Sequence, residues 1–188
     1  MNSNRSFQYK HAAAIVVVAA VCFFASCSEK MEKVEPVQDR AKTPSLRAND
    51  VKTVVSDSGV TRYRINAQEW LVYDKAADPY WDFPKGLHLE KFDPDLKVDA
   101  EIKSKYAIYY TARKLWDLRD SVHAMNLKGE NFETKRLFWD ENKQLVYSDD
   151  TITIKQKDKT IIGKGFESNQ ALTKYTIHKV MGMFPVSE

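Results

Sequence analysis

Three histidines beyond the N-terminal segment are the first candidates for metal binding or acid–base chemistry. They are His88, His123 and His178, and they are widely separated in the sequence. None has another histidine or a carboxylate four residues away, the spacing that places two ligands on one helix face. Isolated histidines of this kind are typical of a surface or of a satisfied position in a sheet. The sequence therefore predicts no metal site and no cofactor.

Two further patterns match catalytic motifs only in part. Gly163-Lys164-Gly165 lacks the rest of a phosphate-binding P-loop and its strand-to-helix setting. Paired carboxylates occur in Asp93-Pro94-Asp95 and Asp149-Asp150, but aspartate is common in turns because its side chain accepts hydrogen bonds from nearby backbone N–H groups. No serine–histidine–aspartate arrangement can be assembled from the spacing. We predict that the protein is not an enzyme.

The second of the two cysteines has a position that predicts covalent modification. Arg5 and Lys10 precede the apolar run AAAIVVVAAVCFFA, which leads to Phe24-Ala25-Ser26-Cys27. This arrangement resembles a bacterial lipoprotein signal with its lipobox. We expect residues 1–26 to be removed and the Cys27 thiol to carry diacylglycerol, which would anchor the protein to a membrane with its domain facing the periplasm.

An uncleaved transmembrane helix is the rival interpretation of this apolar run. Fourteen residues at 1.5 Å each would span about 21 Å, which is short of a bilayer core about 30 Å thick. The lipoprotein interpretation is therefore favoured. It also leaves no free thiol for a disulfide or a zinc site, because Cys22 lies in the removed segment and Cys27 carries lipid.

The rest of the chain divides into a tether and one domain. Residues 27–50 are rich in charge, contain Pro36 and Pro44, and show no sustained hydrophobic period, which indicates a flexible tether. Residues 51–188 form the predicted domain. The whole chain of 188 residues is 43% hydrophobic, with a formal net charge of +3. This near-neutral balance predicts no nucleic-acid partner, which would need a concentrated basic face.

Strand patterns dominate from residue 51 onward. Turn signals recur every eight to twelve residues or so, which is typical of an all-β meander closing into a sandwich or slab. The longest alternation runs over residues 98–111, where apolar side chains share one parity. A single strand of that length would extend roughly 46 Å at about 3.3 Å per residue. We expect one face of it to line the space between two sheets.

The order of several short elements resembles a known family. A tract LWDLRDSVHAMN precedes GENFETKRLFWDENKQLVYSDDTITI, and IIGKGFES follows as a Gly-x-Gly with an aromatic residue. These elements are similar to the OstA-like repeat of the LptC family of lipopolysaccharide-export proteins, over roughly residues 51–186. Familiar members keep an uncleaved transmembrane helix, whereas this chain has the lipobox ending at Cys27.

The resemblance implies an open, twisted β-jelly-roll slab of two antiparallel sheets, with lipopolysaccharide acyl chains between them. The implied partners are lipopolysaccharide, an inner-membrane ABC transporter near the strand VKTVVS, and an LptA-like periplasmic bridge protein at the last strand, residues 172–184. The implied location is the inner membrane. The residues expected to line the acyl chains are Ile102, Tyr106, Ile108, Tyr110, Trp116, Leu118, Val122, Ile152 and Ile154.

A second interpretation stays open on the residues alone. Alternating apolar residues also fill the core of an ordinary β-sandwich. In that case the protein would be a structural or adhesion lipoprotein with a filled core, and the aromatic connection DPYWDFPKG would be its binding loop.

Overall fold

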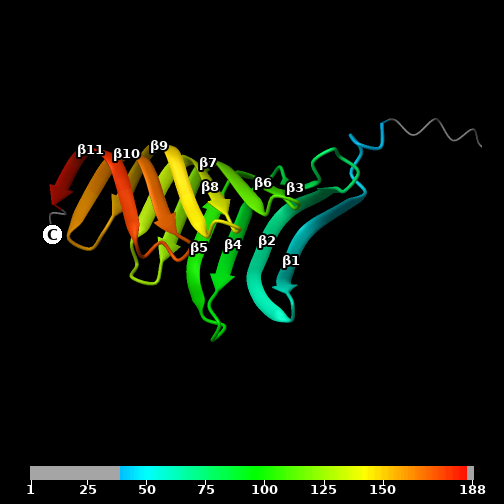
Figure 1. Cartoon of the computed structure of the whole chain (residues 1–188), viewed down its shortest axis with the longest axis horizontal. Coiled ribbons are helices and arrows are strands. Elements are labelled where there is room, and N and C mark those ends of the chain that lie inside the picture. The colour runs from blue at the N-terminus through cyan, green and yellow to red at the C-terminus, as the bar shows by residue number, and fades with distance from the viewer. Residues whose placement is uncertain (1–38, 186–188) are drawn as a thin grey trace, which may run out of the picture. The chain divides into compact units, whose positions relative to one another are not determined.

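The computed structural model describes residues 39–185, and every regular element in that range is a β-strand (Figure 1). The predicted all-β class is therefore confirmed. The predicted signal sequence, Cys27 and residues 27–38 of the predicted tether lie outside the described residues. The strands are β1 (Leu46–Asp57), β2 (Val60–Tyr73), β3 (Tyr80–Phe83), β4 (Leu87–Phe92), β5 (Val98–Ser104), β6 (Tyr106–Tyr110), β7 (Leu115–Asn126), β8 (Asn131–Asp140), β9 (Leu145–Lys155), β10 (Lys159–Asn169) and β11 (Tyr175–Pro185).

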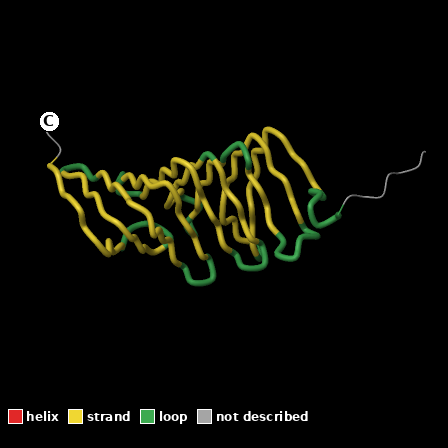
Figure 2. Tube along the Cα trace, turned by 90° about the horizontal axis from the view of Figure 1, so that it is seen from above, coloured by secondary structure: helices red, strands yellow, loops and turns green. Residues whose placement is uncertain are grey.

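All strand pairings are antiparallel and join the strands into one hydrogen-bonded sheet. The order is β11-β10-β9-β8-β7-β5-β4-β2-β3-β6, with β1 on the other edge of β2 and a further pairing of β6 with β7. Two paths therefore connect β2 to β7, one through β4 and β5 and the other through β3 and β6. These six strands form a closed circuit, from which β7 to β11 continue as a meander (Figures 1 and 2).

The long strands bend in their middle, so that each contributes to two facing layers. The bends coincide with left-handed backbone at Asp50, at Asp120 and Ser121, and at Gly165, whose φ angles are 51°, 60°, 56° and 73°. The register shifts beside the bends in β7 and β10. Bulges of this kind let a strand pass from one sheet to another. The line of bends is called the corner here.

Layer A contains β3, β6 and the strand halves that pair with them, and layer B contains β4, β5 and the opposite halves. On the side away from the corner, the turns of the two layers face each other, and this side is called the mouth. The predicted jelly-roll slab of two antiparallel layers is confirmed.

One hydrophobic core fills the space between the layers. Its innermost side chains are each at most 2% exposed: Ile65, Phe83, Leu89, Ile102, Trp116, Leu118, Phe132, Leu137, Trp139, Ile152, Ile154 and Phe166. Burying an aliphatic or aromatic side chain of this size stabilises a fold by about 1.5–3 kcal/mol. The core extends from β2 to β10 and includes both layers.

Two local predictions are wrong. The expected single strand over residues 98–111 is divided into β5 and β6 at Lys105, whose N–H donates to the carbonyl of Asp120 at the corner, 3.0 Å away. The aromatic segment DPYWDFPKG is not simply a connection, because Tyr80–Phe83 forms β3 and pairs with β2 and β6. In addition, β1 begins at Leu46, before the predicted domain boundary at residue 51.

Candidate functional site

Six of the nine residues expected to line the interior lie there. Ile102, Trp116, Leu118, Val122, Ile152 and Ile154 are each at most 2% exposed and belong to the core. They come from β5, β7 and β9, so they cover both layers. Directly opposed residues of an antiparallel pair share a face. The pairing of Ile102 with Ala124 therefore places both side chains in the interior.

The predicted face is wrong for Tyr106, Ile108 and Tyr110. In β6, Ala107 pairs with Leu118 and Tyr109 with Trp116, and these four side chains face the core. Ile108 pairs instead with Asp117, on the outer face. The physical cause is the break at Lys105, because one residue outside the regular ladder exchanges the two faces of every following residue. Tyr109, which the sequence pattern assigned outward, is the inward residue.

A chain of aromatic rings fills the layer A side of the interior. Ring centroids are 4.8 Å apart between Trp70 and Trp81, 5.0 Å between Trp81 and Tyr109, and 4.5 Å between Tyr109 and Trp116. Phe83 stacks at 5.9 Å on Trp116. Such pairs add about 0.5–1.5 kcal/mol beyond area burial. The sequence did not reveal this cluster, since Trp81 and Phe83 lie in the segment interpreted as a connection.

The space towards β11 is filled differently. Phe132, Phe166 and Tyr175 make a second aromatic cluster with centroids 5.4–5.8 Å apart. Between the two clusters, the interior is lined mainly by aliphatic side chains such as Val122, Ala124 and Ile152. The interior is therefore continuous and apolar along the domain.

A cleft of about 440 Å³ opens at the mouth beside the first aromatic cluster. Tyr63 of layer B and Tyr109 of layer A both line it, together with Glu141 of the β8–β9 turn. The ring of Tyr63 meets Trp139 edge-on at 5.3 Å, so the cleft reaches the core directly. Polar side chains from turns of both layers surround it.

Glu141 lies at the inner end of this cleft. Its Oε1 accepts a hydrogen bond of 3.0 Å from the indole Nε1 of Trp116. Burial raises the pKa of Glu141, although Trp116, Tyr63, Lys114 and Tyr109 each favour the charged form. Burial and the nearby Glu141 charge also raise the pKa values of Tyr63 and Tyr109. The sequence pattern did not single out Glu141, which belongs to a turn signal and carries no periodicity.

A few polar contacts close the mouth nearer to β11. The side-chain amide of Asn126, at the end of β7, donates to the carbonyl of Leu172 in the β10–β11 turn at 2.8 Å. Leu172 is 1% exposed, so this turn inserts an apolar side chain into the core. The amide of Gln156 donates to the hydroxyl of Tyr175 at 2.8 Å. We call the Asn126, Gln156, Leu172 and Tyr175 contacts the clasp.

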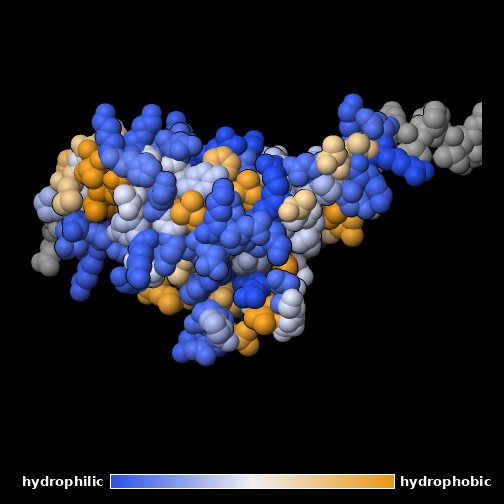
Figure 3. All heavy atoms as spheres, viewed as in Figure 1, coloured by the Kyte–Doolittle hydropathy of each residue, from blue (hydrophilic) through white to orange (hydrophobic). Residues whose placement is uncertain are grey.

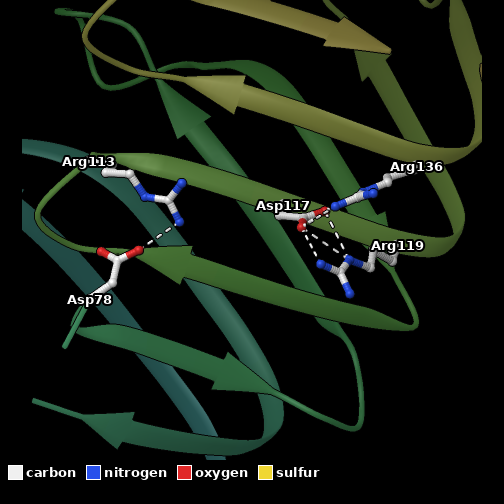
Figure 4. A network of polar contacts seen from close by, with 5 residues as sticks. All are labelled: Asp78, Arg113, Asp117, Arg119 and Arg136. Atoms are coloured by element: carbon white, nitrogen blue, oxygen red, sulfur yellow. Dashed lines mark hydrogen bonds and ion pairs between the residues drawn. The ribbon is translucent and has the colours of Figure 1, made fainter. Parts of the chain in front are cut away.

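The outer face of layer A carries an ionic network (Figure 4). Asp117, whose side chain is 3% exposed, accepts from Arg136 at 2.8 and 2.9 Å and from Arg119. Burial would raise the pKa of Asp117, but the hydrogen bonds from Arg136 and Arg119 outweigh it and hold this pKa below its usual value. The guanidinium of Arg119 also lies over the ring of Tyr106. Arg119 therefore helps to cover Tyr106, an outward residue of β6 that is partly buried.

Both terminal strands of the sheet leave an edge unpaired among the described residues. At β11, Val180 and Met183 pair with the inward positions Gly163 and Ile161. They are nevertheless 55% and 57% exposed, because no strand within residues 39–185 pairs with the other edge of β11. Met181 and Phe184 are similarly exposed. Figure 3 shows hydrophobic side chains gathered at this end of the domain. At β1, Leu46 pairs with Val72 and is 48% exposed.

Two features, a cluster of metal ligands and a membrane-spanning helix, are absent from residues 39–185. No group of three or more potential ligands could hold a metal ion there. In the same range, no helix is long and apolar enough to cross a membrane.

Comparison with known proteins identifies a family. The family described as "Lipopolysaccharide-assembly, LptC-related" matches residues 12–182, which covers most of the chain. No curated protein is significantly similar to the chain.

Proposed function

The chain belongs to the LptC-related lipopolysaccharide-assembly family, which implies a role in lipopolysaccharide transport, and from that premise we propose how its domain carries the lipid. The domain accepts the acyl chains from an inner-membrane ABC transporter into the interior between its layers. It then passes them to an LptA-like periplasmic bridge protein. This role requires no catalysis and no cofactor.

The continuous apolar interior is the observation that carries this proposal. Ile102, Val122, Ile152 and Ile154 form an inner lining with no charged side chain among them. Each acyl methylene that leaves water gains about 0.8 kcal/mol, so such a lining can hold a lipid without a polar pocket. Because the core is filled in the described state, the acyl chains require the layers to separate.

The mouth is the side on which separation costs least. At the corner the layers are joined by continuous strands, whereas at the mouth the clasp joins them through hydrogen bonds such as Asn126–Leu172. A hydrogen bond of this kind contributes about 0.5–1.5 kcal/mol net. We infer that lipid enters and leaves sideways through the mouth.

The two free edges suit partners that add a strand. The exposed inward side chains Val180 and Met183 at β11 would be covered by a following strand of a bridge protein. The β1 edge, with Leu46 exposed, belongs to the first strand of the described residues and would face the transporter. Removal of residues 1–26, lipid on Cys27 and a tether to residue 45 would hold this edge near the inner membrane.

Site-specific crosslinking in cells tests the proposal with three isoleucines. A photoreactive amino acid replaces Ile102 or Ile152, which face the interior, or Ile108, which faces outward. We expect ATP-dependent lipopolysaccharide adducts at Ile102 and Ile152 and none at Ile108. Adducts at all three positions would mean nonspecific contact with lipid.

A filled core is the competing outcome, and the packed aromatic cluster around Trp116 favours it. In that case neither Ile102 nor Ile152 would give an adduct in a protein shown to be folded. The protein would then be a structural or adhesion lipoprotein on the same scaffold.

A further inference from the structure

The cleft at the mouth contains polar side chains, for which apolar acyl chains provide no hydrogen-bonding partners. It borders the apolar interior at Tyr63 and Tyr109. The rest of its lining combines polar and charged side chains with the apolar Val55, Val60, Phe92 and Pro94. A lipid whose chains lie between the layers must leave its headgroup at the mouth. The cleft is therefore placed to contact the headgroup.

The charges of the cleft point away from a phosphate-selective site. Its three cations, Arg62, Lys91 and Lys114, are matched by three carboxylates, Asp57, Asp93 and Glu141. A phosphate site would instead show an excess of donors and positive charge.

Pairing within the structure does not alter this balance. Lys91 is held by Asp99 at 2.5 Å. Asp93 accepts from the backbone N–H groups of Asp95 and Lys97, both at 2.9 Å. These contacts remove one cation and one carboxylate from those that a ligand could reach. Two cations, Arg62 and Lys114, and two carboxylates, Asp57 and Glu141, remain. This equal number suits a ligand whose groups both donate and accept hydrogen bonds.

Side chains at the cleft provide the groups that a polyhydroxyl ring needs. Gln144 offers an amide and Arg62 offers donors, while Tyr63 and Tyr109 present ring surface beside them. Asn142 offers its amide oxygen, because its Nδ2 donates to the carbonyl of Arg113, and Glu141 offers Oε2, because its Oε1 accepts from Trp116. Aromatic rings with an apolar body and a polar edge suit ligands that are themselves both apolar and hydroxylated. Gln144 and Arg62 are exposed and free to reach a ligand.

We propose that this cleft binds the sugar headgroup of the transported glycolipid through its hydroxyl groups, with Glu141 and Gln144 contacting the ring. The inference rests on the proposed function, because it assumes that acyl chains occupy the interior. It adds that recognition is directed at the saccharide and not at its phosphates.

The indole N–H of Trp116 provides a local reporter, because it is bonded to Glu141 at the end of the cleft. The test records nuclear magnetic resonance spectra of the full-length protein, with the Trp116 signal assigned by Trp116→Phe. The first probe is a water-soluble glucosamine disaccharide without acyl chains or phosphates, and the second is inorganic phosphate. We expect the disaccharide to shift the Trp116 signal more than that of Trp70, and phosphate to leave both unchanged.

Two variants with matched controls locate the binding. Gln144→Gly and Arg62→Ala should each weaken the disaccharide about threefold to tenfold, the effect of losing one or two hydrogen bonds. The controls are Leu96→Gly, at another exposed turn position with positive φ, and Lys164→Ala, another exposed cation; neither lines this cleft. Both controls should bind as the wild type does.

Three results would overturn the inference. They are an unshifted Trp116 signal, an equal response to phosphate, or equal weakening by the controls. Because the probe has no acyl chains, failure here leaves the crosslinking test at Ile102 and Ile152 unaffected. Conversely, a shift of the Trp116 signal by the disaccharide, without lipid adducts at Ile102 and Ile152, would support a saccharide site while rejecting acyl-chain transport.

Discussion

The indole Nε1 of Trp116 donates to Oε1 of Glu141 at 3.0 Å, and this bond ties the β8–β9 turn to the aromatic interior. It is a contact between a fully buried donor and a carboxylate whose pKa is raised, chiefly by burial. A buried donor needs an acceptor, but a buried charge destabilises the fold. Substitutions of Glu141 can therefore distinguish the stability contributed by the hydrogen bond from the stability lost to the buried charge.

Replacing Glu141 by glutamine should stabilise the protein at neutral pH. Glutamine keeps an acceptor oxygen for Trp116 and removes the charge. Because the folded pKa of Glu141 is raised, the carboxylate costs stability above that pKa, and the cost disappears as pH falls below its unfolded value of about 4.3. Urea unfolding should show a gain of about 1 kcal/mol at pH 7 that vanishes near pH 4.

Glu141→Ala is the informative counterpart of this substitution. It removes the charge together with the acceptor, so the Trp116 N–H loses its partner, and we expect a net loss of stability. A gain for both variants would mean that the hydrogen bond to Trp116 contributes nothing.

Asp117→Asn should destabilise the protein at neutral pH, by about 1–3 kcal/mol, because two arginines lose a buried counter-charge. The folded pKa of Asp117 is lowered, so its contribution is present above the unfolded pKa of about 3.9 and is lost as pH falls through the folded pKa. Urea unfolding between pH 7 and pH 2.5 should show the wild type converging on the variant. Asp150→Asn, at an exposed position of β9, should have no effect at any pH.

Gly86→Ala should destabilise the connection between β3 and β4. Gly86 has a φ of 89°, and an added Cβ would lie 2.7 Å from the carbonyl oxygen of Ser104. Gly59 has a similar φ of 80° but open space around its Cβ position. Gly59→Ala should therefore lower the free energy of unfolding only by the cost of placing alanine in left-handed backbone, about 1–2 kcal/mol. Thermal unfolding of both variants isolates the clash, and equal losses would contradict a close approach at Ser104.

The double substitution Val180→Glu and Met183→Glu should weaken binding of the proposed bridge protein at least tenfold while leaving thermal stability nearly unchanged. Both side chains are more than half exposed at the β11 edge, so charge there opposes only the addition of a strand. Leu127→Glu, at a position 66% exposed in the β7–β8 turn, is the control. Equal binding by the double variant and the control would exclude β11 as the docking edge.

Residues 98–111 show how far the sequence predicts this fold. Alternation correctly placed Ile102 in the interior, because its strand pairs regularly with β4 from Ala100 to Ser104. It failed from Tyr106 onward, because Lys105 leaves the ladder and bonds to Asp120, a residue of another strand. A local pattern contains no information about such a long-range contact. Glu141 escaped notice for a similar reason, since only the folded structure brings the turn beside Trp116.

The closed circuit of strands also has a consequence for how the chain reaches its native state. Of the pairings in the described structure, β2–β4, β3–β6 and β5–β7 join strands that are not consecutive, and all three belong to the circuit. The meander from β7 to β11 is built from neighbours in sequence, so its hairpins pay little loop-closure entropy and should form early. The strand pairings of the circuit join segments that are farther apart in the sequence, so they should form later. Pulse-labelled hydrogen exchange during refolding should therefore protect the amides of β8 to β10 before those of β3 and β6, and the growing chain would complete its aromatic interior last.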